Sequence, residues 1–191
     1  AGGQESHALL IDCRSLETTP VPLPDDVSVT IIDSGVRREL ADSAYNDRRR
    51  ECEAAAAFLG VDELRDATLD DLGELSGAWD PVSYRRARHV ISENQRTLEA
   101  ADVLRAGNLR RMGQLMAGSH ASLRDDFEVT VPAIDDLVEL VSGVLNGEGG
   151  VRMTGGGFGG CVVALVPLLL GAVLLVRLAL QELPVADVRV R

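Results

Sequence analysis

Apolar residues form short runs near the start of the chain and recur at helical spacing through its middle. Residues 9–12 and 27–33 are runs rich in Ile and Val, typical of buried strands. The segment between them, residues 18–24, carries prolines that restrict it to a sheet edge or a loop. We therefore expect a hairpin-like pair of strands that leads into a central strand.

The middle of the chain predicts helices with recognisable ends. Ser43 is placed to cap a helix that Gly60 ends, and Pro81 follows an aspartate at the start of a long helix. Asn146 and Gly147 end the last helix of this region. The predicted helices cover residues 44–59, 70–75, 81–106, 109–123 and 132–145.

A glycine-rich loop runs into an apolar strand near the end of the chain. Residues 155–160 hold five glycines around one phenylalanine, and residues 162–166 are a mostly β-branched apolar run that predicts a buried strand. Glycines give positive φ freely and expose backbone N–H groups at close range. Such a loop suits an anion such as phosphate, and it equally suits a tight turn before a core strand.

The tail of the chain is unusually apolar. Residues 168–180 are almost wholly apolar, but Pro167 and Arg177 interrupt the run. We expect a helix packed on the sheet, not a membrane span, followed by a short strand over 185–190. Strands that alternate with paired helices predict an α+β fold, with helices layered on an antiparallel sheet.

Composition narrows the function. A net charge of −11 over 191 residues argues against a nucleic-acid partner. All 19 basic side chains are arginine, which excludes a lysine-dependent phosphate loop and a Schiff base. Cys13, Cys52 and Cys161 are widely spaced and fit reduced core cysteines, and no signal peptide opens the chain, so we expect a cytoplasmic protein.

Four segments together resemble the galactokinase family, which is part of the GHMP small-molecule kinases. The last of them is the glycine-rich run with the valine and arginine before it, which resembles the third motif of the GHMP kinases. The segments occur in family order and at family spacing, and the resemblance covers residues 6–167. They are residues 7–18, 40–55, 119–132 and 151–161.

The resemblance implies a fold and a division of the chain. Residues 40–191 would form the GHMP kinase C-terminal domain, a ferredoxin-like antiparallel sheet covered by helices. Residues 1–39 would be strands leading from a missing N-terminal half. The catalytic aspartate, the main phosphate loop and the metal ligands of the family would lie upstream of Ala1, so no catalytic or metal residue is assigned here.

The same resemblance assigns two sets of substrate residues. Tyr45 would hydrogen-bond the sugar, although its residue type and position alone predict only a half-buried tyrosine near a helix start. Gly155, Gly156, Gly157 and Gly159 would shape the pocket close to the sugar and the nucleotide phosphates. We expect Gly156 to need positive φ or a close ligand approach.

Other polar residues have simpler interpretations. The arginines at 48–50 predict a solvated helix face, with a phosphate clamp as the less favoured alternative. His120, like the other two histidines, is expected to be structural. Asp125 and Asp126 are expected to form a solvated turn, with a cation site as the alternative.

The resemblance thus implies the C-terminal part of a galactokinase, which would phosphorylate α-D-galactose to galactose 1-phosphate with ATP and Mg²⁺. Its partners would be galactose, ATP and the N-terminal half of the same polypeptide, with no nucleic acid and no membrane. The chain alone would be inactive. Two alternatives stay open, a non-catalytic sugar sensor and a kinase for a related sugar such as N-acetylgalactosamine or arabinose.

Overall fold

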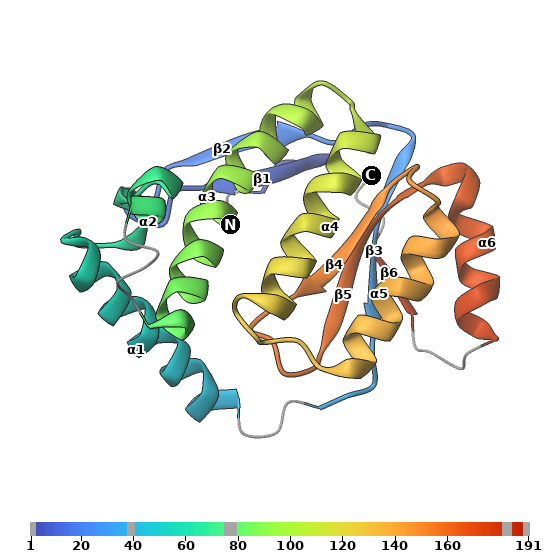
Figure 1. Ribbon diagram of the computed structural model, residues 1–191. Helices are drawn as coiled ribbons and strands as arrows, with labels where there is room; N and C mark the ends of the chain where they lie inside the picture. Colours follow the sequence, from blue (N-terminus) through green and yellow to red (C-terminus); the bar gives the residue numbers. More distant parts are fainter. Residues whose placement is uncertain (1–2, 38–40, 75–79, 181–184, 189–191) are drawn as a thin grey trace.

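The computed structural model describes residues 3–37, 41–74, 80–180 and 185–188 (Figure 1). A two-stranded hairpin, a four-stranded sheet and a set of helices make up this part of the chain. The elements, in chain order, are β1 His7–Ile11, β2 Thr18–Pro22, β3 Val27–Asp33, α1 Ala41–Leu59, the 3₁₀ turn η1 Leu64–Asp66, α2 Leu69–Glu74, α3 Pro81–Arg105, α4 Leu109–Asp125, α5 Pro132–Leu145, β4 Gly150–Thr154, β5 Cys161–Pro167, α6 Leu168–Ala179 and β6 Val185–Val188.

The four-stranded sheet confirms the expected α+β architecture. Its strand order is β4-β5-β3-β6, and every neighbouring pair is antiparallel. Alternate residues of the strands, among them Ile32, Met153 and Val162, pack against Ile134 and Val141 of α5 in one core. Because side chains along a strand alternate between the two faces of a sheet, these alternate apolar residues all lie on one face, and the helices cover that face.

The first two strands form the expected hairpin. β1 pairs with β2 from His7 opposite Pro22 to Ile11 opposite Thr18. In a two-stranded sheet each strand is an edge, so the prolines of β2 lose no essential ladder bond. Ion pairs tie the hairpin turn to η1, with Arg65 to Asp12 at 2.7 Å and Arg14 to Asp66 at 2.6 Å.

Most helix ends lie where the sequence predicts them. The carboxylate of Asp80 accepts a hydrogen bond from the Ser83 amide at 2.8 Å, and Asn146 ends α5 with φ of 46°. The prediction for Ser43 was wrong, because α1 begins at Ala41 and places Ser43 inside the helix. Alanine is the best helix former, and an acidic residue in the first turn favours the N-terminal dipole, so the helix starts earlier.

Two features near the C-terminus add to the predicted picture. β4, which the sequence analysis missed, pairs with β5 and places the glycine-rich loop between two strands. The tail is a helix as expected, yet only one stripe of α6 is covered: Leu174 and Leu178 are buried, whereas Leu169 is 93% exposed. Within the described ranges, no helix has the length and apolar character that crossing a bilayer requires.

Glycines let α4 approach β4 closely. A Cβ added at Gly113 would lie 2.0 Å from the carbonyl oxygen of Gly149, whereas a Cβ at Gly143 of α5 would meet nothing within 4 Å. We predict that Gly113→Ala lowers the free energy of unfolding by about 1–3 kcal/mol, because backbone has to move. Gly143→Ala should raise it by about 0.5–1 kcal/mol through helix propensity.

Urea unfolding of the two variants, followed by circular dichroism, measures the difference. Equal changes in the two variants would contradict the close packing of α4 on β4.

Candidate functional site

A buried arginine on α3 joins three parts of the structure. Arg86 is 2% exposed, and its Nε donates to Glu51 of α1 at 2.8 Å. Its Nη2 donates to Glu128 at 2.6 Å, and its Nη1 donates to the carbonyl oxygen of Asp126. A guanidinium is planar and points its N–H donors in fixed directions, so it can bind these three acceptors at once. Arg86 therefore fixes α1, α3 and the segment 126–129, which links α4 to α5.

A second arginine holds the same segment from α1. Arg48 donates through Nε to the carbonyl oxygen of Phe127 at 2.6 Å and through Nη2 to that of Glu128 at 3.3 Å. The prediction that residues 48–50 form a solvated face is therefore wrong for Arg48. Consecutive side chains on a helix point roughly 100° apart, so three arginines in a row cannot share one face. Arg49 and Arg50 do lie on the exposed side of α1.

Behind Phe127 lies a chain of buried polar side chains, in which His89 has the structural role that the sequence predicted but partners that it did not. The hydroxyl of Ser122 donates to Asp126 at 3.0 Å, so it accepts from Nδ1 of His89, which lies 2.9 Å away. The His89 ring stacks on Phe127, with ring centroids 4.4 Å apart. Burial lowers the pKa of His89 to about 4, and the nearby carboxylates oppose this shift without reversing it.

Asp125 and Asp126 form no cation site. Asp126 is buried and accepts from Arg88 as well as from Ser122, and Asp125 is paired with Arg124 at 2.8 Å. Each carboxylate is thus neutralised by its own arginine. The expected solvated turn holds for Asp125 and fails for Asp126, which α3 covers.

The glycine-rich loop packs on this same segment. The amide of Phe158 donates to the carbonyl oxygen of Val129 at 2.7 Å. A Cβ at Gly157 would lie 2.6 Å from that oxygen, and one at Gly159 would lie 2.7 Å from the carbonyl oxygen of Val36. Both glycines have positive φ, 86° and 122°. The glycines at 157 and 159 are therefore required by the fold itself.

Gly156 differs from its neighbours and corrects an expectation. Its φ is outside the left-handed region, and a Cβ there would meet nothing within 4 Å, so the backbone does not demand glycine at this position. Gly155, with φ of 85°, is exposed beside it. Within the described part of the chain, the amides of Gly155, Gly156, Gly157 and Gly159 have no hydrogen-bond acceptor. Gly157 and Gly159 are buried, so the exposed amides of this loop are those of Gly155 and Gly156, with open space beside Gly156.

Tyr45 lies on α1 one turn before Arg48. It is 56% exposed, more than the half-buried position that its sequence context predicts. It borders a cavity of about 320 Å³ whose other walls include Cys52, Val90 and Phe127. Burial raises the pKa of the Cys52 thiol to about 11, which keeps it protonated and inert at neutral pH.

Segment 127–129 is the physical link between the two sets of predicted site residues. Arg48, one turn after Tyr45 on α1, donates to the carbonyl oxygens of Phe127 and Glu128. The carbonyl oxygen of Val129 accepts from the Phe158 amide of the glycine-rich loop. Arg86 was missed because no motif marks it, and His89 was expected only to be structural, without its partners. Their three-residue spacing beside the buried Ala87 and Ile91 is the signal that could have placed them on the inner side of α3.

The buried neutral His89 makes stability depend on pH. The unfolded chain takes up a proton as the pH falls below about 6.5, whereas folded His89 does so only near pH 4. The stability that neutral His89 contributes is thus complete above pH 6.5 and is lost between about pH 6.5 and 4. We predict a loss on the order of 1–3 kcal/mol over this range.

His89→Gln, which keeps an N–H donor but does not titrate, should reduce this loss. Urea unfolding at several pH values measures it. An identical pH dependence in the variant and the unchanged chain would show that His89 is not buried in the neutral form.

Comparison with known proteins agrees with this geometry. Residues 100–172 match the family described as GHMP kinases C terminal. The chain is similar to the crystal structure of Lactococcus lactis galactokinase complexed with galactose, with 31% identity and a TM-score of 0.84 over 99% of this chain and 51% of that one. It shares its fold with L. major mevalonate kinase in complex with R-mevalonate, at 16% identity and a TM-score of 0.57 over 91% of this chain and 44% of that one.

The chain spans about half the length of each of these two structures. The family match covers the helices α4 and α5, the strands β4 and β5 of the sheet, and the loop between these strands. Residues 100–172 therefore match the C-terminal domain of the GHMP kinases, and the chain as a whole shares its fold with about half of the galactokinase structure.

Proposed function

We propose that the complete polypeptide containing this chain is a galactokinase, which transfers the γ-phosphoryl group of ATP to the anomeric hydroxyl of α-D-galactose. The support is the 31% identity, over 99% of this chain, to a galactokinase complexed with galactose. The observation that carries the proposal is the link through residues 127–129. This segment contacts the turn of α1 next to Tyr45 and also the glycine-rich loop.

Each part of the proposed site offers a group that a sugar kinase needs. Tyr45 presents a flat ring and a hydroxyl that can donate or accept, and its 56% exposure leaves both available to a sugar. The exposed amides of Gly155 and Gly156 suit the negative oxygens of a nucleotide phosphate. The open space around Gly156 leaves room for such a ligand.

We assign no magnesium ligand among the residues that the structure describes. Within the described ranges, no three His, Cys, Asp or Glu side chains lie close enough together to hold a metal ion. Mg²⁺, the catalytic base and the main phosphate loop belong, in this proposal, to the N-terminal half of the polypeptide. Because phosphoryl transfer depends on positioning and charge stabilisation by all these parts, the chain alone should not turn over galactose.

Two expectations stay predictions. One is the division of the chain into residues 1–39 and a C-terminal domain of residues 40–191, and the other is a cytoplasmic location. The chain contributes to the enzyme the sugar-facing tyrosine, the glycine-rich loop and the arginine-held segment that joins them.

Tyr45→Phe in the complete polypeptide tests the proposal, because it removes one hydroxyl and keeps the ring. Loss of one such hydrogen bond, about 1 kcal/mol, predicts a roughly fivefold lower kcat/KM for galactose, with the KM for ATP unchanged. Steady-state formation of galactose 1-phosphate, with both substrates varied, measures this.

Tyr84→Phe is the matched control, since Tyr84 lies on α3, where its ring faces the guanidinium of Arg88 at 5.9 Å. That variant should keep the full kcat/KM. Equal values for Tyr45→Phe and the unchanged enzyme would remove Tyr45 from the sugar site. The absence of galactose 1-phosphate from the unchanged polypeptide would contradict the proposed function itself.

A further inference from the structure

The helix α6 presents apolar side chains to solvent on the side that faces away from the sheet. It packs against α5 and the strands β3 and β5, and it lies at the margin of the molecule in Figure 1. Leu174 and Leu178 supply its buried stripe. Four large apolar residues on the opposite side are more than half exposed, and we call them the outer row. They are Leu169, Val173, Val176 and Leu180.

The outer row is straight. Successive residues of an α-helix are roughly 100° apart, so steps of four, three and four residues keep a row within a narrow arc of the surface. Leu180, the residue after the helix, continues the row because its backbone is still helical, with φ of −68° and ψ of −17°. The same steps separate the a and d positions through which the helices of a coiled coil pack. The geometry of the outer row therefore fits a second helix.

The order of residues in the outer row fits a second copy of the same helix. The row reads Leu, Val, Val, Leu, which is the same in both directions. Two antiparallel copies of α6 would set Leu169 of one copy against Leu180 of the other, and Val173 against Val176, in two equivalent halves. A symmetric interface has this property, because the same patch meets itself and the contact of residue i with residue j occurs twice.

Charge favours the same contact. A net charge of −11 makes two copies of the chain repel each other. α6 holds one charged residue, Arg177, and no acidic residue. In the antiparallel pair Arg177 would lie opposite Ala172 of the other copy, so no like charges would meet. Two copies can thus approach along the outer row without bringing their carboxylates together.

The exposed area is that of a weak but specific interface. The exposed fractions along the outer row are 93%, 52%, 61% and 72%, which amount to nearly three fully exposed residues in each copy. Two copies would therefore cover on the order of 1,000 Å² of accessible surface, close to the least that a specific interface buries. An interface of this size implies a dissociation constant roughly in the micromolar range.

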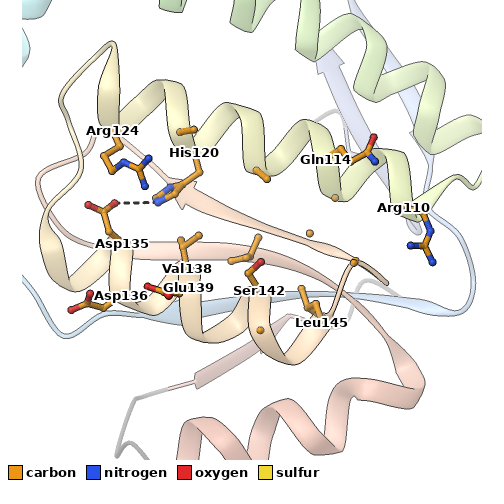
Figure 2. Close-up of a pocket in the computed structure, with 18 residues that line it drawn as sticks. Arg110, Gln114, His120, Arg124, Asp135, Asp136, Val138, Glu139, Ser142 and Leu145 are labelled. Atoms are coloured by element: carbon orange, nitrogen blue, oxygen red, sulfur yellow. Dashed lines mark ion pairs between the residues drawn. The ribbon is translucent and has the colours of Figure 1, made fainter.

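The outer row lies apart from the two hollows of the surface. None of its residues lines the cavity beside Tyr45 or the groove between α4 and α5 that Figure 2 shows. The buried end of that groove is closed by the ion pair of His120 and Asp135, at 3.1 Å. We propose that the chain forms a symmetric dimer in which two α6 helices pack antiparallel along the outer row. This dimer does not depend on the proposed galactokinase activity.

Sedimentation velocity of the 191-residue chain at micromolar concentrations tests the proposal, and should show an equilibrium between monomer and dimer. Val173→Glu and Val176→Arg should each weaken the dimer at least tenfold, because each places a charge in an apolar contact. Leu98→Glu on α3 is the matched control, since Leu98 is 62% exposed and Val176 is 61% exposed. The control should change the dissociation constant by less than a factor of two.

A mixture of the two charged variants tests the antiparallel register. In the mixed pair Val173→Glu of one copy faces Val176→Arg of the other, while the other half of the interface keeps its contact between two valines. The mixture, followed with one variant fluorescently labelled, should therefore associate at least fivefold more tightly than either variant alone. Parallel helices would set each position against itself and would give no such gain.

Three results of sedimentation would overturn the proposal: a monomer at every concentration, a dimer that Val173→Glu does not weaken, or no gain in the mixture. Flotation with neutral phosphatidylcholine vesicles tests the other use of an apolar helix face. Vesicle binding by a chain that stays monomeric would make the outer row a membrane surface. The complete polypeptide should show the same gain in the mixture, and its absence there would overturn the proposal by showing that another part of the polypeptide covers α6.

Discussion

The buried guanidinium of Arg86 is the constraint on which the rest of the structure depends. It donates to two carboxylates, those of Glu51 and Glu128, and to the carbonyl oxygen of Asp126. Removing one carboxylate partner should cost on the order of 1–3 kcal/mol, because the buried guanidinium would lose a hydrogen-bond acceptor. Together with Arg48, Arg86 connects the helical layer of α1 and α3 to the segment that follows α4.

The consequence for the proposed site is geometric. Glu128 is held with φ of 54°, a conformation that a non-glycine residue keeps only when its surroundings over-determine it. Arg86 and Arg48 provide those surroundings, and the turn they hold presents the carbonyl oxygen of Val129 to Phe158. The glycine at 157 is then needed because no side chain fits against Val129. Charge on α1 and α3 thus sets the position of a loop far along the sequence.

The sequence predicted local features well because each rests on neighbours in the chain. The Asp80 cap, the end of α5 at Asn146 and the apolar strand β5 follow from capping chemistry and periodicity. Only the resemblance to the galactokinase family assigned both the loop and Tyr45 to a substrate site. The pattern of residues alone made no such assignment. The start of α1 was wrong by a few residues, the usual fate of helix boundaries.

What the sequence did not predict depends on contacts between distant segments. Arg48 and its two neighbours are chemically identical in the sequence, and only the position of Phe127 decides that Arg48 turns inward. Likewise, the five glycines of the loop look alike in the sequence. The fold requires glycine at 157 and 159, where a Cβ would clash, but not at 156. β4 escaped notice because five residues with a glycine and an arginine carry little strand signal, and its pairing with β5 makes it a strand.

The central claim is that Arg86 positions the glycine-rich loop through residues 126–129, and hydrogen exchange at the Phe158 amide tests it most directly. In Arg86→Met, this amide should exchange at least tenfold faster relative to the amides of Leu174 and Leu178 in α6, because its acceptor on Val129 is no longer held. Arg50→Met, which breaks an exposed pair, should leave the ratio unchanged. If Arg86→Met also leaves the Phe158 ratio unchanged, the loop is positioned without Arg86 and the account is contradicted.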